Sequence, residues 1–149
     1  MGKLAGLPLA NLQNMAALAS LRSSQLHGYI MDFSLTAEQK MLQDTARRFA
    51  AEELPAHAKA IEENNTPPNL ALRKRFAEMG FMGINLPTEY GGAGLGHFEA
   101  VLILEELAKI SVAVAFPVFE ASFGPALAIA HFAPEALRQR ILPKVCLGE

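Results

Sequence analysis

The 149-residue sequence predicts an all-α protein, an up-and-down or orthogonal bundle of about six helices. Apolar residues recur at steps of three and four along most of the chain, which is the spacing of one helix face. Glycine and proline clusters divide these periodic segments from one another. No pair of alternating segments is available to form a sheet, so helices are the expected elements throughout.

The first helix is expected to begin at Thr36, because Thr36 and Gln39 have the spacing of a capping box. Its apolar positions continue to Leu54, and Pro55 is expected to end it. A short helix should follow over residues 56–63. The next break is expected at 64–68, where Asn-Asn-Thr-Pro-Pro restricts the backbone.

Another helix is expected from about Asn69, and Gly80 is well placed to close it in the left-handed conformation. After a glycine-rich segment, residues 97–110 predict a helix that is apolar around most of its circumference and therefore buried. Residues 112–116 have the composition of a strand, but they are short and lack a partner segment. We therefore expect one helix from 112 to about 131.

The last helix is expected to begin with Pro134 at its first helical position. Leu137, Ile141 and Val145 then predict its inner stripe.

Composition excludes several classes of function. The net charge is −2 with 51% hydrophobic residues, so no positive field favours nucleic acid. Cys146 is the only cysteine, which fits a reducing compartment, and a cytoplasmic localisation is expected. Pro117 and Glu120 interrupt the longest apolar stretch, so we expect a soluble protein without membrane contact.

Residues 1–30 differ in amino-acid composition from the rest of the chain. They contain Lys3 and Arg22 but no acidic residue, with leucines scattered among small and polar residues. A weak targeting peptide is one interpretation, but an extension that is flexible or loosely helical is favoured, because no cleavage signature follows. The expected domain covers residues 31–149.

The segment 86–96, LPTEYGGAGLG, contains four glycines and raises the question of phosphate binding. A dinucleotide fingerprint needs G-x-G-x-x-G between a strand and a helix, and a P-loop needs a following Lys-Ser/Thr pair. Neither pattern is present. The segment therefore predicts a bend that lets two helices approach.

Other candidate chemistry is weak. Glu105 and Glu106 are adjacent, but neighbours on a helix point about 100° apart, so structural or solvent pairing is expected. His57 has the helix spacing for a pair with Glu53. No histidine or cysteine spacing predicts a metal site, and the basic run 73–75 predicts a solvated helix face. No catalytic, cofactor-binding or metal-binding residue is predicted.

One helical face is more informative, because Phe116, Phe119, Glu120 and Phe123 place three rings and one carboxylate together. Aromatic stripes usually belong to a core, but ligand pockets are also mostly apolar and aromatic. The spacing alone leaves both alternatives open.

Three stretches together resemble the N-terminal α-helical domain of the acyl-CoA dehydrogenase family of flavoenzymes. They are DFSLTAEQKMLQDTARRFAAEELP, MGFMGINLPTEYGGAGLGHFEAVLILEELAKIS and HFAPEALRQRILPKVCLGE. The resemblance covers residues 31–149. Departures are Ala133, where the family has glycine, Leu137 and Arg138, which replace Gln-Lys, and residues 1–30, which match nothing.

The resemblance implies that Phe116, Phe119, Glu120 and Phe123 lie on the helix that forms the floor of the acyl pocket and bind substrate. It implies FAD as cofactor of the complete enzyme, in which a glutamate removes the α-proton and the flavin takes the β-hydride. Those enzymes have a β middle domain and a C-terminal helical domain that are absent from this sequence, and they are commonly homo-oligomers. We therefore expect this chain to be one domain of an acyl-CoA dehydrogenase, inactive alone. The alternative is a stand-alone module that binds a partner protein or acyl-CoA.

Overall fold

A computed structural model describes residues 33–149, in which the secondary structure is helical. The predicted start of the domain at residue 31 and the predicted extension 1–30 lie outside the described residues. The helices are α2 (Ala37–Asn64), α3 (Leu70–Glu78), the 3-10 helix η1 (Thr88–Tyr90), α4 (His97–Ala108), α5 (Val112–Ser122), α6 (Pro125–Phe132) and α7 (Glu135–Cys146). The all-α bundle is thereby confirmed.

Helix α2 begins as predicted but is not broken at Pro55. The Thr36 hydroxyl accepts from the Gln39 backbone N–H at 3.2 Å, and the Gln39 side chain accepts from the Thr36 N–H at 3.0 Å. Pro55 lies inside the helix, which runs on to Asn64. The missing hydrogen bond would have joined Pro55 to the carbonyl of Ala51, and Ala51 faces solvent. The predicted break at Pro55 is therefore wrong, because water can satisfy that carbonyl.

The predicted single helix over 112–131 is instead two helices, α5 and α6. The N–H groups of Phe123 and Gly124 both donate to the Phe119 carbonyl, which closes α5. Gly124 then approaches the preceding turn so closely that a Cβ there would lie 3.0 Å from the Glu120 Cα. Pro125 starts α6 at a position that needs no N–H. Pro117 stays inside α5.

The segment Val112–Phe132 is long and apolar enough to span a membrane by length and composition, with a mean hydropathy of 1.7. The expectation that proline and glutamate make this stretch too short for a span is therefore wrong on these criteria. One such segment is weak evidence, because a core helix passes the same test. Here 39% of the window is buried, and it includes the core residues Val114 and Val118.

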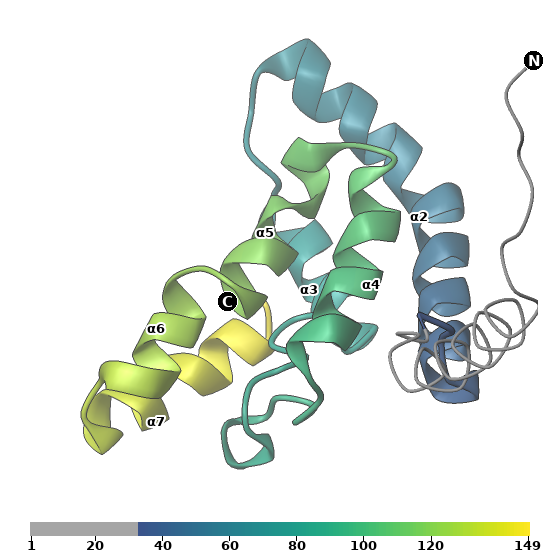
Figure 1. Cartoon of the computed structure of the whole chain (residues 1–149). Helices are drawn as coiled ribbons and strands as arrows, with labels where there is room; N and C mark the ends of the chain where they lie inside the picture. Colours follow the sequence, from purple (N-terminus) through teal and green to yellow (C-terminus); the bar gives the residue numbers. More distant parts are fainter. Residues whose placement is uncertain (1–32) are drawn as a thin grey trace, which may run out of the picture. The chain divides into compact units, whose positions relative to one another are not determined.

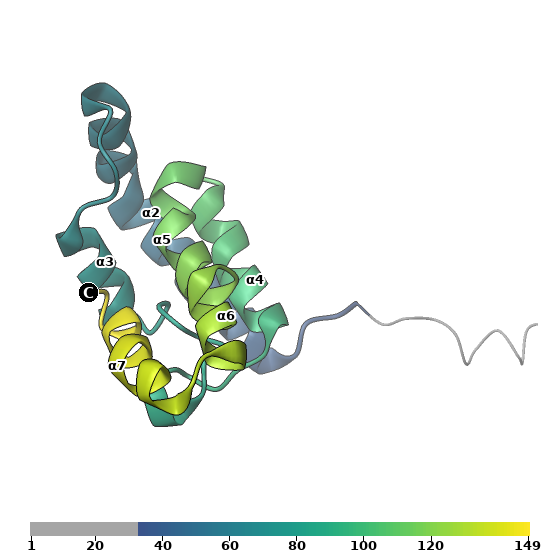
Figure 2. The ribbon, with the colours of Figure 1, turned by 90° about the vertical axis from the view of Figure 1, so that its left-hand side faces the viewer.

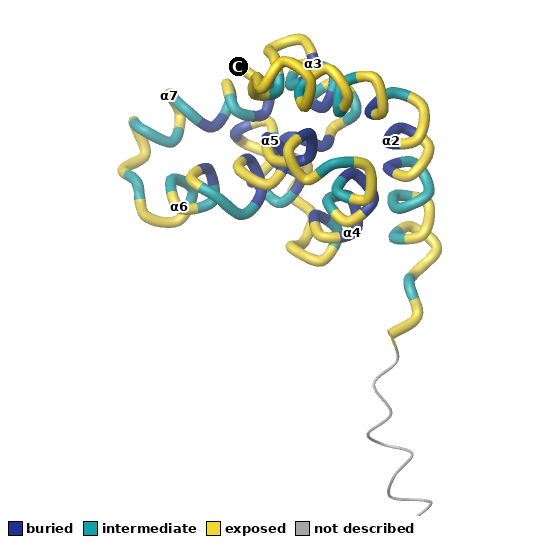
Figure 3. Tube along the Cα trace, turned by 90° about the horizontal axis from the view of Figure 1, so that it is seen from above, coloured by how far each residue is buried: buried dark blue, intermediate teal, exposed yellow. Residues whose placement is uncertain are grey.

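The main core lies between α2, α3, α4 and α5. Figure 1 shows α4 lying between α2 and α5, and α4 contacts both. The Phe49 ring of α2 packs against Phe76 of α3 at 5.7 Å between centroids and edge-on against Phe81 at 5.5 Å. In Figure 3 the buried side of α2 faces α4. These aromatic contacts join the first helix to the chain that leads into the glycine segment.

A second cluster packs beneath the glycine segment, where α6 and α7 meet η1. It contains Leu86, Tyr90, Ala126, Leu142 and Cys146. Burial raises the pKa of the Cys146 thiol, so this cysteine is a packed core residue.

The end of α7 returns to α3, as Figure 2 shows. There Gly148 has φ +74°, and a Cβ would lie 2.5 Å from the Arg73 carbonyl oxygen.

Helices α4 and α7 differ in detail from expectation. Helix α4 is not buried all round, because Phe98 is 53% exposed and Val101 45% exposed. Gly80 does close α3 with φ +73°, as predicted. In α7, Pro134 precedes the helix instead of occupying its first helical position. The expected inner stripe of α7 is only half-buried, because the fully buried residues, Leu142 and Cys146, each lie one position further along.

Candidate functional site

Three phenylalanine rings follow one another along α5, and we call Phe116, Phe119 and Phe123 the aromatic row. The Phe116 and Phe119 centroids are 5.7 Å apart with planes at 29°, and those of Phe119 and Phe123 are 6.2 Å apart at 31°. His97, at the start of α4, contacts Phe123 edge-on at 5.9 Å. The predicted clustering on one helical face is therefore present.

The aromatic row is not a core stripe. Phe116 is 49% exposed and Phe119 is 40% exposed, while Phe123 is half-buried against the main core. The core face of α5 is formed instead by small and β-branched residues, including Val114, Ala115 and Val118. Two of the three rings thus expose the apolar surface that the ligand-wall alternative requires.

Glu120 lies beside the aromatic row but turns toward a different hollow. It lines a groove of about 240 Å³ together with Pro117 and Ala121 of α5, apolar residues of α6 and α7, and the polar side chains of Arg73 and Glu149. The Glu120 side chain is exposed. The four residues singled out by the sequence therefore divide between two adjoining surfaces, the rings on one and the carboxylate on the edge of the other.

Asn85 holds the end of α5 in place, and sequence reasoning missed it. Its Nδ2 donates to the Ser122 carbonyl oxygen at 2.9 Å, which satisfies one of the free carbonyls at the helix end. The Ser122 hydroxyl and the Asn85 Oδ1 are buried without a hydrogen-bond partner among residues 33–149. A lone polar residue inside the apolar run 81–86 was the available signal. This contact fixes the position from which Phe119 and Phe123 project.

The glycine segment is closed by its own backbone. The N–H groups of Gly92, Gly94 and Leu95 donate to the carbonyls of Pro87, Leu86 and Ile84 respectively, at 2.9 to 3.2 Å. A Cβ at Gly92 would lie only 2.2 Å from the Leu86 oxygen. These donors are therefore not free to hold a phosphate, and the prediction of a bend is confirmed.

Tyr90 and Glu135 tie the same segment to α7. The Tyr90 hydroxyl donates to the Glu135 carboxylate at 2.9 Å. Burial, and then the bond to Glu135, raise the pKa of Tyr90, while bonds from Gln139 and Tyr90 lower the pKa of Glu135. Both shifts move the groups away from neutral pH, so the pair is structural and not poised for proton transfer.

The adjacent carboxylates of α4 have separate surroundings. Glu106 is 2% exposed and accepts from Arg47 Nη2 at 3.1 Å and from Lys109 Nζ at 2.9 Å. Burial would raise the pKa of Glu106, but the bonds from Arg47 and Lys109 hold it below its usual value. Glu105 is exposed and lies 3.6 Å from Lys109. The expectation of structural pairing is confirmed.

Glu53 pairs chiefly with Arg75 of α3, and the expected partner His57 adds only a weaker electrostatic effect that also lowers the pKa of Glu53. Arg75 Nη2 lies 2.7 Å from the Glu53 carboxylate, and this hydrogen bond is the main cause of the lowered pKa of Glu53. Arg75 also contacts Glu78 at 2.9 Å, so one member of the basic run 73–75 is an ion-pair residue and not only a solvated cation.

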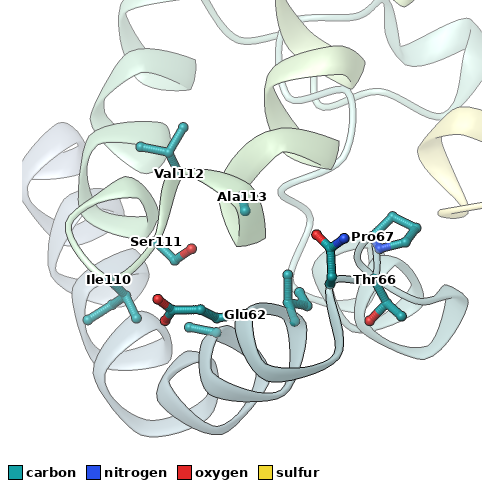
Figure 4. Close-up of a pocket in the computed structure, with 10 residues that line it drawn as sticks. Glu62, Thr66, Pro67, Ile110, Ser111, Val112 and Ala113 are labelled. Atoms are coloured by element: carbon teal, nitrogen blue, oxygen red, sulfur yellow. The ribbon is translucent and has the colours of Figure 1, made fainter.

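A further hollow lies between the end of α2 and the start of α5 (Figure 4). Its lining includes Glu62, Thr66 and Ser111, and Figure 4 shows Glu62 on the α2 side with Ser111 opposite. Glu62 is the one ionisable residue on its wall, so it lacks the paired groups that acid–base chemistry needs. Within residues 33–149 no group of three metal-ligating side chains occurs.

Comparison with known proteins identifies the family that this chain resembles. The family model described as acyl-CoA dehydrogenase, N-terminal domain, matches residues 36–149. The mitochondrial isovaleryl-CoA dehydrogenase of Bos taurus is 34% identical over 140 residues, which are 93% of this chain and 33% of the relative. The glutaryl-CoA dehydrogenase of Desulfococcus multivorans is 32% identical over 121 residues, 80% of this chain and 31% of the relative.

A solved acyl-CoA dehydrogenase from Bacillus anthracis, complexed with FAD, has a similar fold. It superposes with a TM-score of 0.70 at 26% identity and covers 77% of this chain and 19% of that one. The chain thus spans about a third of the length of the curated relatives.

Proposed function

This chain belongs to the acyl-CoA dehydrogenase family, whose N-terminal domain it matches, and on that premise we propose that it forms one wall of the acyl pocket of an FAD-dependent dehydrogenase. The complete enzyme would oxidise the α,β-bond of an acyl-CoA thioester. The observation that carries the proposal is the exposure of the aromatic row on α5. Rings that the core does not use provide the apolar surface that ligand pockets need.

The neighbouring groove supplies the polar side of the proposed wall. Glu120 lies between the row and the groove, at the edge of an apolar floor formed by Pro117 and Ala121. An apolar surface with a few polar groups at its rim is the usual composition of a small-molecule site. The substrate-binding role of Phe116, Phe119, Glu120 and Phe123 remains a prediction.

Within residues 33–149, the glycine segment does not fit the flavin. The glycine segment is the natural candidate for a pyrophosphate cradle, but most of its N–H groups donate to carbonyls of the segment itself or of Gly83 and Ile84 just before it. A Cβ at Gly92 would meet backbone and not open space. We therefore propose that FAD is held chiefly by domains outside this chain, and that residues 1–149 alone do not turn over acyl-CoA. No reaction step is assigned to a residue of this chain.

The proposed partners are the acyl-CoA substrate, the middle and C-terminal domains found in relatives, and further copies of the enzyme. Exposed apolar side chains support the presence of a covering partner, because Phe98 and Val101 of α4 and Val112 of α5 remain open to solvent. Nucleic acid is not a proposed partner. The absence of membrane contact and the cytoplasmic localisation stay predictions.

Photolabelling tests the acyl wall. A butyryl-CoA analogue with a diazirine at the end of its acyl chain is irradiated with the purified chain, and the labelled peptide is identified by mass spectrometry. We expect label within Phe116–Phe123, and we expect excess butyryl-CoA to suppress it. Label spread over the surface, or label that butyryl-CoA does not displace, would contradict the proposal. Absorbance at flavin wavelengths after incubation with FAD and gel filtration tests the second part, and retained stoichiometric flavin would overturn it.

A stand-alone interaction module is the second candidate, and the exposed apolar residues of α4 and α5 favour it equally. Light scattering with a hydrophobic dye tests both candidates together, because a clean monomer that binds no dye would count against each of them. The photolabelling experiment separates them, since only the acyl wall predicts label that butyryl-CoA displaces.

A further inference from the structure

On the premise of the proposed acyl wall, we infer that the aromatic row selects an aryl acyl group. The site then prefers a thioester with a flat aromatic substituent to an aliphatic one of the same size. The row supplies the specificity, and Phe116 and Phe119 are the residues that determine it.

The spacing of the row suits the addition of another ring. Aromatic pairs favour centroid separations of about 4.5–7 Å in offset or edge-on arrangements. The two steps within the row are 5.7 and 6.2 Å, with planes only 29° and 31° apart. Phe116 ends the row, is its most exposed ring, and among residues 33–149 contacts the ring of Phe119 alone. A substrate ring placed on its open side therefore continues an existing stack.

The length of the row limits the substituent to about one ring. Phe116 and Phe123 are seven residues apart, which corresponds to about 10 Å along the helix axis. At the other end of the row, α5 ends at Ser122 with Phe123 as its C-cap, and the His97 ring already occupies the side of Phe123, so the open end of the row is at Phe116. A long flexible chain would extend past this wall, whereas a single ring next to a thioester stays on it.

Physical chemistry favours a ring over a saturated group on this surface. A phenyl and a cyclohexyl group bury nearly the same apolar area, so the hydrophobic term does not separate them. Ring pairs gain an additional contribution from their quadrupoles, which corresponds to about two- to tenfold in affinity. A straight chain also loses rotamer freedom when it is bound, which a rigid ring does not.

Proton NMR titration of the chain with phenylacetyl-CoA and cyclohexylacetyl-CoA tests the inference, because the two probes differ only in the character of the six-membered ring. We expect phenylacetyl-CoA to bind about two- to tenfold more tightly. We also expect upfield ring-current shifts of its phenyl protons.

The variant Phe116→Leu, which removes the ring on which the substrate ring would stack but leaves an apolar side chain, should lose the preference, and Phe119→Leu, which removes the central ring, should reduce it. Phe132→Leu is the matched control, because Phe132 is 87% exposed on α6 and lies outside the row. It should keep the wild-type preference.

The outcomes separate the inference from the proposed function. Equal affinity of the wild-type chain for the two probes overturns the aryl preference and leaves the acyl wall standing. A preference that survives in both Phe119→Leu and Phe116→Leu places the aryl site elsewhere and overturns the role of the row. Saturable binding of neither probe at millimolar concentration contradicts the acyl wall itself. Circular dichroism of each variant confirms that a lost preference does not reflect unfolding.

Discussion

The glycine segment and the aromatic row are the two most conspicuous features of this chain, and they differ in whether their interactions are complete. In the segment 86–96, most backbone donors bond to carbonyls of the segment itself or of the residues just before it, and its Leu86 and Tyr90 side chains are buried. On α5, Phe116 and Phe119 contact one another but remain open on their outer side. A feature that satisfies its own groups stabilises the fold, whereas one that leaves apolar surface exposed is available to a ligand.

The largest loss of stability is expected when a side chain is added where the backbone of the glycine segment packs most closely. In Gly92→Ala the new Cβ would lie 2.2 Å from the Leu86 carbonyl oxygen, and backbone cannot swing away as a side chain can. We expect the free energy of unfolding to fall by about 3 kcal/mol, measured by urea denaturation.

Gly80→Ala is the matched control for that variant. Gly80 has a positive φ, +73°, which Gly92 does not have, and no atom lies within 4 Å of the added Cβ. Its loss should be limited to the left-handed strain of about 1–2 kcal/mol. Equal losses in the two variants would show that close packing of the segment is not what stabilises it.

Glu106 and Glu105, adjacent on α4, allow the same comparison of a buried and an exposed group for charged side chains. Glu106→Ala removes the acceptor that bridges Arg47 of α2 and Lys109 of α4, so it should lower the free energy of unfolding by about 2 kcal/mol. The neighbouring Glu105→Ala, on the exposed side, should change it by less than about 0.5 kcal/mol. Similar effects of both substitutions in urea denaturation would mean that burial of Glu106 adds nothing to its pairing.

Acid should weaken the fold through the same carboxylate. The pKa of Glu106 is lower in the folded chain than in the unfolded one, so the unfolded state binds protons first as the pH falls. The stability that this group contributes is complete above the ordinary glutamate pKa of about 4.3 and is lost as the pH drops through the folded value. Thermal unfolding between pH 7 and pH 3 should therefore decline less steeply in Glu106→Gln. A parallel decline in both proteins would contradict this role.

Sequence signals predicted helix ends correctly where the interactions lie within one helical turn. They failed where the outcome depends on solvent exposure or on contacts between distant residues. The Thr36–Gln39 box and Gly80 predicted helix ends correctly, because both act within one turn. The predicted helix end at Pro55 was wrong, because the effect of a proline inside a helix depends on whether the carbonyl left without a hydrogen bond faces water. Only the packed structure shows that the Ala51 carbonyl does.

The same distinction applies to the candidate site. Spacing alone placed three rings on one face of a helix, but their exposure depends on which face of α5 the core uses. The Asn85 contact with the Ser122 carbonyl joins residues 37 positions apart, and no local pattern predicts it. Likewise, the break at Gly124 depends on its close approach to Glu120 in the folded chain.

The aromatic row should contribute little to stability, and this expectation tests the comparison with the glycine segment directly. Phe119→Leu removes a ring that is 40% exposed and leaves an apolar side chain in its place, so the free energy of unfolding should change by about 0.5 kcal/mol. Phe76→Leu, the same substitution at a fully buried ring that packs on Phe49, should lower it by about 2 kcal/mol. Urea denaturation of both variants measures the difference. If Phe119→Leu were as destabilising as Phe76→Leu, the row would belong to the core. Its exposure would then no longer support a ligand-binding role.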